Sequence, residues 1–149
     1  RHTQRSNNII NEIKDLDLNV QLRSTDNKIS KNTDIYLVDS YGETKSFYKI
    51  CKTVFLGGSL INHGGQNPLE PARFGCKILH GPYVQNFSEV YNFLEKNNLS
   101  SKFHNTEQLV NSVKKSFSTK TNFSNKTIKL KEMGSYILNK TFTDISNYL

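Results

Sequence analysis

Four of the chain's eight glycines lie within one stretch of nine residues, Gly57 to Gly65. Glycine at this density lets the backbone adopt positive φ and lets a ligand come close to the main chain. The stretch follows the apolar run Thr53-Val54-Phe55-Leu56, which is typical of a buried strand. A strand, a glycine loop and a helix start in this order hold anions and nucleotides in α/β proteins. The spacing therefore predicts a binding site that includes Gly58, Ser59, Gly64 and Gly65.

The sequence Asn67-Pro68-Leu69-Glu70 has the features of a helix start. Asn67 is a favourable N-cap, and proline is favoured at the first helical position. Glu70 stands three residues after the cap, where its side chain can return a hydrogen bond to the Asn67 backbone in a capping box. The free backbone amides of a helix start also attract phosphate. We therefore expect Asn67 and Glu70 to shape the end of the loop, and a role in binding is compatible with this.

The other reactive side chains form no recognisable catalytic or metal-binding set. The four histidines are far apart in the sequence and no carboxylate pair accompanies them, so we expect no metal ion and no cofactor. His63 and His80 are interpreted as incidental histidines rather than acid–base catalysts. Cys51 and Cys76 lack metal or redox spacing and are expected to be small buried thiols. Ser59 is not a predicted nucleophile, because Gly-Gly-Ser-Leu lacks the elbow pattern.

Strands alternate with helices along the chain, which predicts βαβ units and an α/β fold with a parallel sheet. The expected strands cover residues 19–22, 35–38, 53–56, 77–80 and 101–103. The expected helices cover residues 7–14, 44–50, 68–74 (ended by Gly75), 87–96 and 106–116. Ligands of such sheets bind beyond the carboxyl ends of the strands. The loops 39–43, 57–66 and 80–86 each follow a strand, so we expect them on one rim.

The length of the chain fits one domain, which we place at residues 1–118. Residues 119–126 are rich in Ser, Thr and Asn, as is typical of a linker. Residues 128–149 carry apolar side chains at near-helical spacing. We therefore expect residues 119–149 to form a linker and a C-terminal helical segment.

The formal net charge of +7 bears on the class of partner. The lysines are scattered and no basic run is interleaved with aromatic residues, so we expect no nucleic-acid partner. The charge instead favours a phosphorylated substrate or an anionic membrane surface. No apolar segment approaches the roughly 20 residues that a transmembrane helix needs, and no signal peptide is visible.

Three blocks of sequence together carry a family resemblance: Gly57-Gly58-Ser59-Leu60, the run from Gly64 to Ala72, and Gly81-Pro82 with Asn86-Phe87. With this spacing the chain closely resembles the 3-deoxy-D-manno-octulosonic acid (Kdo) transferases of lipid A assembly. Those enzymes have two Rossmann-like domains that face each other across a cleft, the GT-B arrangement. The resemblance covers residues 1 to at least 96. It implies that the chain is most of the carboxy-terminal, donor-binding half, without its first strand and without the amino-terminal acceptor domain.

The resemblance also implies donor-binding roles for particular residues. Glu70 is expected to accept hydrogen bonds from the ribose hydroxyls of the donor, CMP-Kdo, and Asn67 to contact the donor. Arg1 and His2 match the family's Pro-Arg-His segment. An arginine fork suits either the phosphate or the sugar carboxylate of CMP-Kdo. A disordered terminus is the open alternative for these two residues.

A second family segment, Asp-Thr-Met-Gly-Glu, is matched by the loop that contains Gly42 and Glu43. The resemblance implies that both residues contact the nucleotide, and capping of the next helix is the open alternative for Glu43. This chain departs from the family at Ser40 and Tyr41, which replace Thr and Met. It also has Gln66 where the family usually has His, which argues against an imidazole role at that position.

The activity implied by the resemblance is transfer of Kdo from CMP-Kdo to a lipid A precursor, at the cytoplasmic face of the bacterial inner membrane. The general base that activates the acceptor hydroxyl is then a carboxylate of the amino-terminal domain, so we expect no catalytic residue in this chain. Two alternatives stay open: the donor domain of another nucleotide-sugar GT-B glycosyltransferase, and a non-enzymatic nucleotide-binding module. A binding panel of CMP, UDP, GDP and ADP separates the two transferases, and a longer reading frame without an acceptor domain would favour the module.

Overall fold

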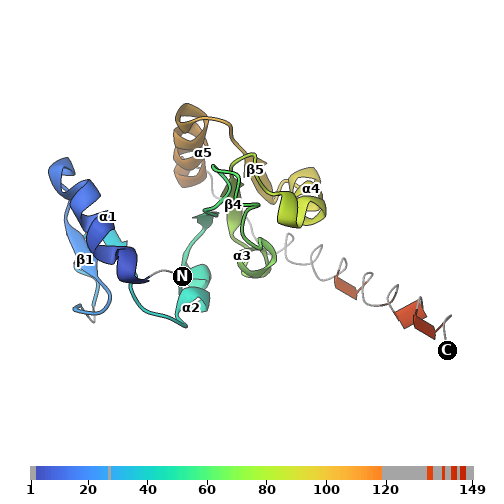
Figure 1. The fold of residues 1–149 in the computed structure, drawn as a ribbon, viewed down its shortest axis with the longest axis horizontal. Helices are drawn as coiled ribbons and strands as arrows, with labels where there is room; N and C mark the ends of the chain where they lie inside the picture. The colour runs from blue at the N-terminus through green and yellow to red at the C-terminus, as the bar shows by residue number, and fades with distance from the viewer. Residues whose placement is uncertain are drawn as a thin grey trace. The chain divides into compact units, whose positions relative to one another are not determined.

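The computed structural model describes residues 3–26 and 28–118, and in the C-terminal segment residues 134–135, 139, 142–143 and 145–146. The chain divides into two compact units, unit 1 (Arg1–Thr44) and unit 2 (Lys45–Leu149). Figure 1 shows the helices and strands of both units with their labels.

Unit 1 contains a helical segment and a two-stranded parallel sheet. The helical segment consists of the 3-10 helix η1 (Thr3–Arg5), the α-helix α1 (Ser6–Ile13) and the 3-10 helix η2 (Lys14–Leu16). The strands β1 (Val20–Leu22) and β2 (Ile35–Leu37) pair with Val20 opposite Ile35. The start of this pairing is fixed by the Asp34 carboxylate, which accepts a hydrogen bond from the Asn19 amide at 2.9 Å.

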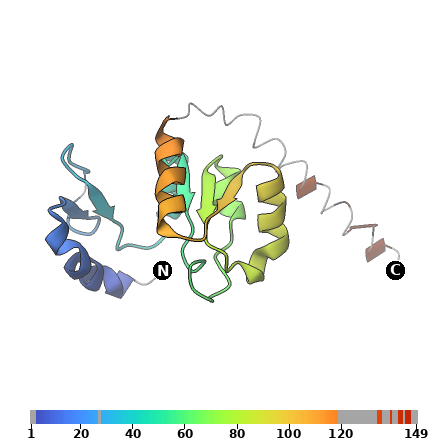
Figure 2. The same ribbon diagram turned by 90° about the horizontal axis from the view of Figure 1, so that it is seen from above.

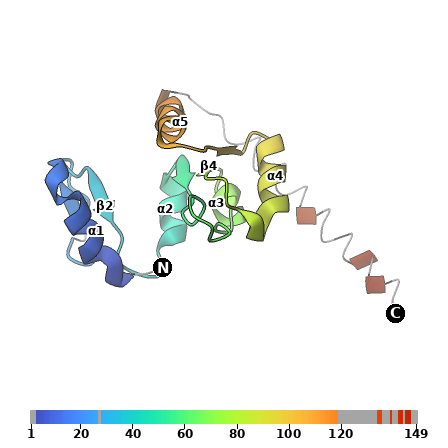
Figure 3. The same ribbon diagram turned by 45° about the horizontal axis from the view of Figure 1, so that its top comes forward.

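Unit 2 is built on a three-stranded parallel sheet with the order β3-β4-β5. Its elements follow one another as α2 (Thr44–Ile50), β3 (Thr53–Phe55), α3 (Leu69–Arg73), β4 (Lys77–His80), η3 (Gln85–Phe87), α4 (Ser88–Lys96), β5 (Ser100–Lys102) and α5 (Thr106–Ser118). The strands lie between α5 and α3 (Figures 1 and 3). The central strand, β4, is buried from Ile78 to His80. Burial of successive residues is typical of a parallel strand, which is covered on both faces.

The core of unit 2 forms where α4 packs against the sheet. Tyr91 and Leu94 of α4 and Ile78 of β4 are all 0% exposed. The preceding helix, α3, ends at Gly75, whose φ is +79°. The Gly75 amide donates to the carbonyl of Ala72 at 2.9 Å, as in a Schellman-type helix end. Gly75 therefore ends this helix as its sequence position predicts.

The α/β class and the parallel pairing of the strands are confirmed, and each predicted element is found within two residues of its expected bounds. Two details differ. The described strands form a two-stranded and a three-stranded sheet instead of one, and the first residue of the predicted helix 87–96 belongs to η3. The boundary after residue 118 stays a prediction. The expected linker at 119–126 lies outside the described residues, whereas the described residues between 134 and 146 are helical.

Candidate functional site

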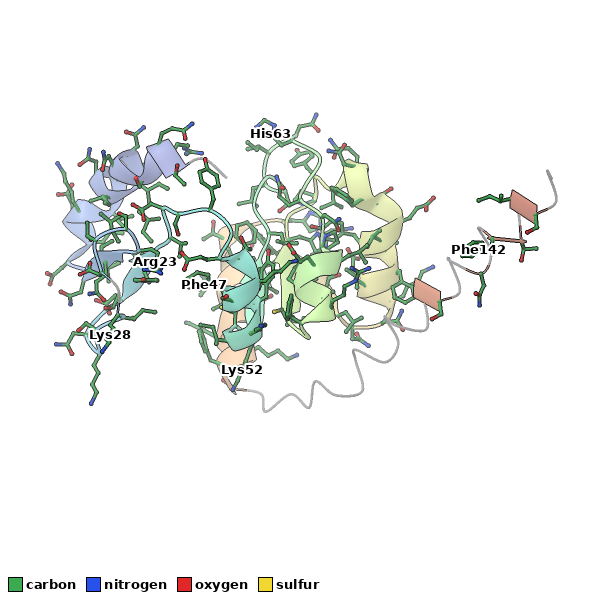
Figure 4. All side chains as sticks on the ribbon, turned by 90° about the horizontal axis from the view of Figure 1, so that it is seen from below. Arg23, Lys28, Phe47, Lys52, His63 and Phe142 are labelled. Carbon is green, nitrogen blue, oxygen red and sulfur yellow. The ribbon has the colours of Figure 1, made fainter. Side chains whose placement is uncertain are left out.

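The loop between β3 and α3 adopts the backbone conformations that favour glycine. The angle φ is +70° at Gly58, +83° at Gly64 and +75° at Gly65. Figure 2 shows this loop extending past one end of the strands, and Figure 4 places His63 at its outer part, opposite Lys52, which precedes β3. Of the four glycines in this stretch, Gly58, Gly64 and Gly65 have the predicted positive φ and Gly57 does not. The loop lies at the carboxyl end of β3.

Ser59 joins the two loops that follow β3 and β4. Its side chain is 0% exposed, and its Oγ donates a hydrogen bond to the Leu56 carbonyl at 2.6 Å. The same Oγ accepts a hydrogen bond from the Gly81 amide at 2.9 Å, and the Ser59 carbonyl accepts one from the Tyr83 amide at 3.0 Å. The loops 57–66 and 80–86 therefore lie side by side, as predicted for these two of the three loops. The hydroxyl of Ser59 holds them together, and contact of Ser59 with a ligand stays a prediction.

The two loops approach each other so closely that a side chain would not fit at two of their glycines. A Cβ atom on Gly64 would lie 2.2 Å from Nδ2 of the Asn86 side chain. The backbone N–H of Asn86 donates a hydrogen bond to the Gly64 carbonyl at 3.2 Å. A Cβ atom on Gly81 would lie 2.2 Å from the carbonyl oxygen of Ser59. Gly81 was not among the predicted site residues. The signal that points to it is a glycine directly after a buried strand and directly before a proline.

The helix after the glycine loop begins at Leu69, one residue later than expected. The N-cap residue is Pro68, without a side-chain cap hydrogen bond, so the prediction of Asn67 as N-cap and Pro68 as first helical residue is wrong by one position. Asn67 lies one residue before the N-cap, and its Oδ1 accepts a hydrogen bond from the Leu69 amide at 3.0 Å. Glu70 is exposed, and its carboxylate makes no hydrogen bond with the residues that the structure describes. The reciprocal bond of a capping box therefore does not form here, and the expected hydrogen bond to ribose stays a prediction.

The loop with Gly42 and Glu43 belongs to unit 1. Gly42 has a φ of +86°. The Glu43 carboxylate accepts hydrogen bonds from the hydroxyl of Ser40 and from Nε of Arg23, which lies 3.0 Å from Oε1 and 3.1 Å from Oε2. The bonds from Ser40 and Arg23 lower the pKa of Glu43. Glu43 is therefore held within unit 1. Its contact with a nucleotide, and the placement of this loop on the rim of the unit 2 loops, stay predictions.

The remaining candidates are the two amino-terminal residues, the two cysteines and His80. Arg1 and His2 lie outside the described residues, so their donor contacts stay predictions. Cys76 is buried as expected, and burial raises the pKa of its thiol to about 11. The same expectation is wrong for Cys51, which is exposed. His80 is fully buried at the end of β4, where burial lowers the pKa of its imidazole.

Among the residues that the structure describes, no group of three or more His, Cys, Asp or Glu side chains is placed to hold a metal ion. No described helix combines the length and the apolar character needed to cross a membrane.

The parallel sheets, the helices around them and the glycine loop at a strand end define a Rossmann-like α/β protein. No protein-family model matches the chain. In sequence it is 38% identical over 91 residues to the 3-deoxy-D-manno-octulosonic acid transferase of Haemophilus influenzae, covering 61% of this chain and 21% of that enzyme. It is 37% identical over 57 residues to the transferase of the same name from Aquifex aeolicus, covering 38% of this chain and 16% of that enzyme.

A solved structure gives the corresponding match in fold. It is the C-terminal CMP-Kdo binding domain of WaaA from Acinetobacter baumannii, with a TM-score of 0.79 and 26% sequence identity. The match covers 89% of this chain and 69% of that domain structure. The resemblance to Kdo transferases is therefore confirmed, in sequence and in the fold of a CMP-Kdo-binding domain. The chain spans only about a fifth of the length of the curated relatives it matches.

Proposed function

We propose that this chain binds CMP-Kdo as the donor-binding half of a Kdo transferase, which moves Kdo to a lipid A precursor. The observation that carries the proposal is the pair of loops at the carboxyl ends of β3 and β4, joined through buried Ser59. These loops have the position that nucleotide ligands take in open α/β sheets. The fold match to a CMP-Kdo binding domain supports the same ligand.

The residues of the loops suit this donor. Gly64 and Gly65 are buried against Asn86 and Val84, so the missing side chains let the two loops pack together at the carboxyl ends of the strands, where the donor is proposed to bind. The exposed carboxylate of Glu70 is open to the ribose hydroxyls of the same ligand. In the reaction this half would hold the donor and stabilise the departing phosphate of CMP electrostatically. The general base belongs, by resemblance, to an amino-terminal domain.

The membrane location of the enzyme is part of the proposal. The lipid A precursor is an amphipathic acceptor, and we place the enzyme at the cytoplasmic face of the bacterial inner membrane. The formal net charge of +7 favours an anionic membrane surface there. Association with vesicles that contain anionic lipid, and its loss in high salt, would support this placement.

Titration calorimetry of the 149-residue chain with CMP, UDP, GDP and ADP tests the donor. We expect CMP to bind more tightly than the other three nucleotides. Tighter binding of UDP, GDP or ADP would contradict the CMP-Kdo assignment and favour a transferase with a different donor. Absence of binding to every nucleotide would contradict the donor-binding role itself.

Replacement of Glu70 by alanine should weaken CMP binding by about tenfold or more, because hydrogen bonds to a charged group contribute roughly 1.5–3 kcal/mol. The thermal midpoint should change little, since the carboxylate makes no hydrogen bond with the described residues. Titration calorimetry and thermal melts measure the two effects separately.

Glu107→Ala is the matched control for this variant. Glu107 is also an exposed glutamate in the first turn of a helix, α5, so its loss has a comparable effect on the helix dipole. We expect wild-type CMP affinity in Glu107→Ala. Equal affinities in the two variants would show that Glu70 does not bind the nucleotide.

A further inference from the structure

The helix α4 contacts both loops of the proposed site through two side chains one turn apart. Tyr91 is fully buried, and its hydroxyl donates a hydrogen bond to the carbonyl of Gln66 at 2.8 Å. Gln66 lies directly before Asn67, whose Oδ1 accepts a hydrogen bond from the amide of Leu69, the first residue of α3. This hydrogen bond therefore fixes the end of the loop that follows β3.

Glu95 reaches the second loop through His80. Its Oε1 lies 3.1 Å from Nε2 of His80, and the Nδ1 of His80 lies 2.8 Å from the carbonyl oxygen of Gly81. The Gly81 amide in turn donates to Ser59 of the glycine loop. The rings of His80 and Tyr91 pack together with their centroids 4.3 Å apart. A continuous path of contacts thus runs from α4 through β4 to both loops.

We propose that Tyr91, His80 and Glu95 are positioning residues that hold the two loops in the arrangement that binds the donor. We call these three side chains the α4 brace. The proposal rests on the proposed function for its ligand, because the loops are those expected to bind CMP-Kdo. None of the three side chains needs to touch the donor. The apparent Kd equals the Kd of the binding arrangement divided by the fraction of molecules that adopt it. Loss of the brace lowers this fraction and is therefore expected to raise the Kd.

The contact between His80 and Glu95 depends on which nitrogen of the imidazole carries a proton. If Nδ1 of neutral His80 donates to the Gly81 carbonyl, then Nε2 presents a lone pair to a carboxylate oxygen. Neither Nε2 nor Oε1 makes a regular hydrogen bond with the described residues. The ammonium of Lys102, 3.6 Å from Oε1, is the nearby cation at this carboxylate. A glutamine at position 95 offers an N–H donor to Nε2, so Glu95→Gln should preserve the brace.

The test compares five forms of the 149-residue chain: wild type, Tyr91→Phe, Glu95→Ala, Glu95→Gln and the control Tyr36→Phe. Tyr36 is a suitable control because its hydroxyl also donates to a backbone carbonyl, that of Asp26 at 3.1 Å, in unit 1. Amide hydrogen exchange by NMR reports on the loops at Gly65 and Gly81, whose amides donate to Gly58 and Ser59. Calorimetry with CMP gives the Kd.

Loss of the Tyr91 hydrogen bond to Gln66 should raise the Kd for CMP about fivefold. Glu95→Ala removes the side chain that faces the His80 imidazole, and we expect a shift in the same direction. Both variants should show faster exchange at Gly65 or Gly81. Glu95→Gln and Tyr36→Phe should match the wild type. A lowered thermal midpoint with unchanged exchange and Kd in Tyr91→Phe would overturn the positioning role of Tyr91. Equal behaviour of Glu95→Ala and Glu95→Gln would overturn that of the His80–Glu95 contact.

The exchange measurement separates this proposal from the proposed function. If the wild-type chain binds no CMP, the proposed function fails, but faster exchange at the two loops in the brace variants still supports the brace. If CMP binds and exchange is unchanged in those variants, the brace fails and the donor site stands.

Discussion

Replacement of Gly81 by alanine should lower the free energy of unfolding by about 1–3 kcal/mol, the usual cost of overpacking. A Cβ atom at this position would lie 2.2 Å from the carbonyl oxygen of Ser59 and 2.7 Å from its carbonyl carbon. Both atoms belong to backbone, so a rotamer change cannot relieve the clash. The loops must separate, and this breaks the hydrogen bond from the Gly81 amide to Ser59. Urea denaturation gives the loss of stability, and calorimetry should show loss of CMP binding.

Gly57→Ala is the matched control, because a Cβ atom on Gly57 would meet no atom within 4 Å. Both substitutions restrict the unfolded chain equally, so this contribution cancels in the comparison. We expect Gly57→Ala to change the free energy of unfolding by less than about 0.5 kcal/mol. Equal stabilities of the two variants would contradict the close approach of the loops at Gly81.

The second large effect concerns turnover. We expect the 149-residue chain by itself to bind CMP and yet to transfer no Kdo from CMP-Kdo to a tetraacylated lipid A precursor. In a two-domain transferase the donor and the acceptor are held on opposite walls of one cleft, and rate enhancement by positioning needs both of them bound. The resemblance places the acceptor wall and the general base in an amino-terminal domain. The chain matches only 21% of the length of the Haemophilus influenzae enzyme.

Release of CMP from CMP-Kdo measures this turnover, with the full-length transferase of Haemophilus influenzae as the positive control. The chain's own affinity for CMP shows in the same preparation that its site is folded. Turnover by the chain at a rate near that of the full-length enzyme would contradict both the assignment of the chain to the donor half and the location of the base.

The sequence by itself determined the elements and the local backbone of the site. Residues 77–80 were predicted as a short strand between two helices, and β4 occupies those residues. The dense glycines predicted positive φ, which is found at Gly58, Gly64 and Gly65. Gly75 predicted a helix end. These features are predictable because propensity, periodicity and the steric freedom of glycine act over a few neighbouring residues.

Only the tertiary structure decided how the loops are held together. Ser59 and Gly81 are 22 residues apart, and no local pattern shows that the hydroxyl of that serine is buried against the amide of that glycine. His80, interpreted from the sequence as an incidental histidine, is buried against Tyr91 and faces Glu95. Burial and hydrogen-bond partners at such separations depend on how β4 and α4 pack. The sequence therefore predicted which loop binds the donor, whereas the packing of α4 against the sheet decided which buried side chains contact that loop.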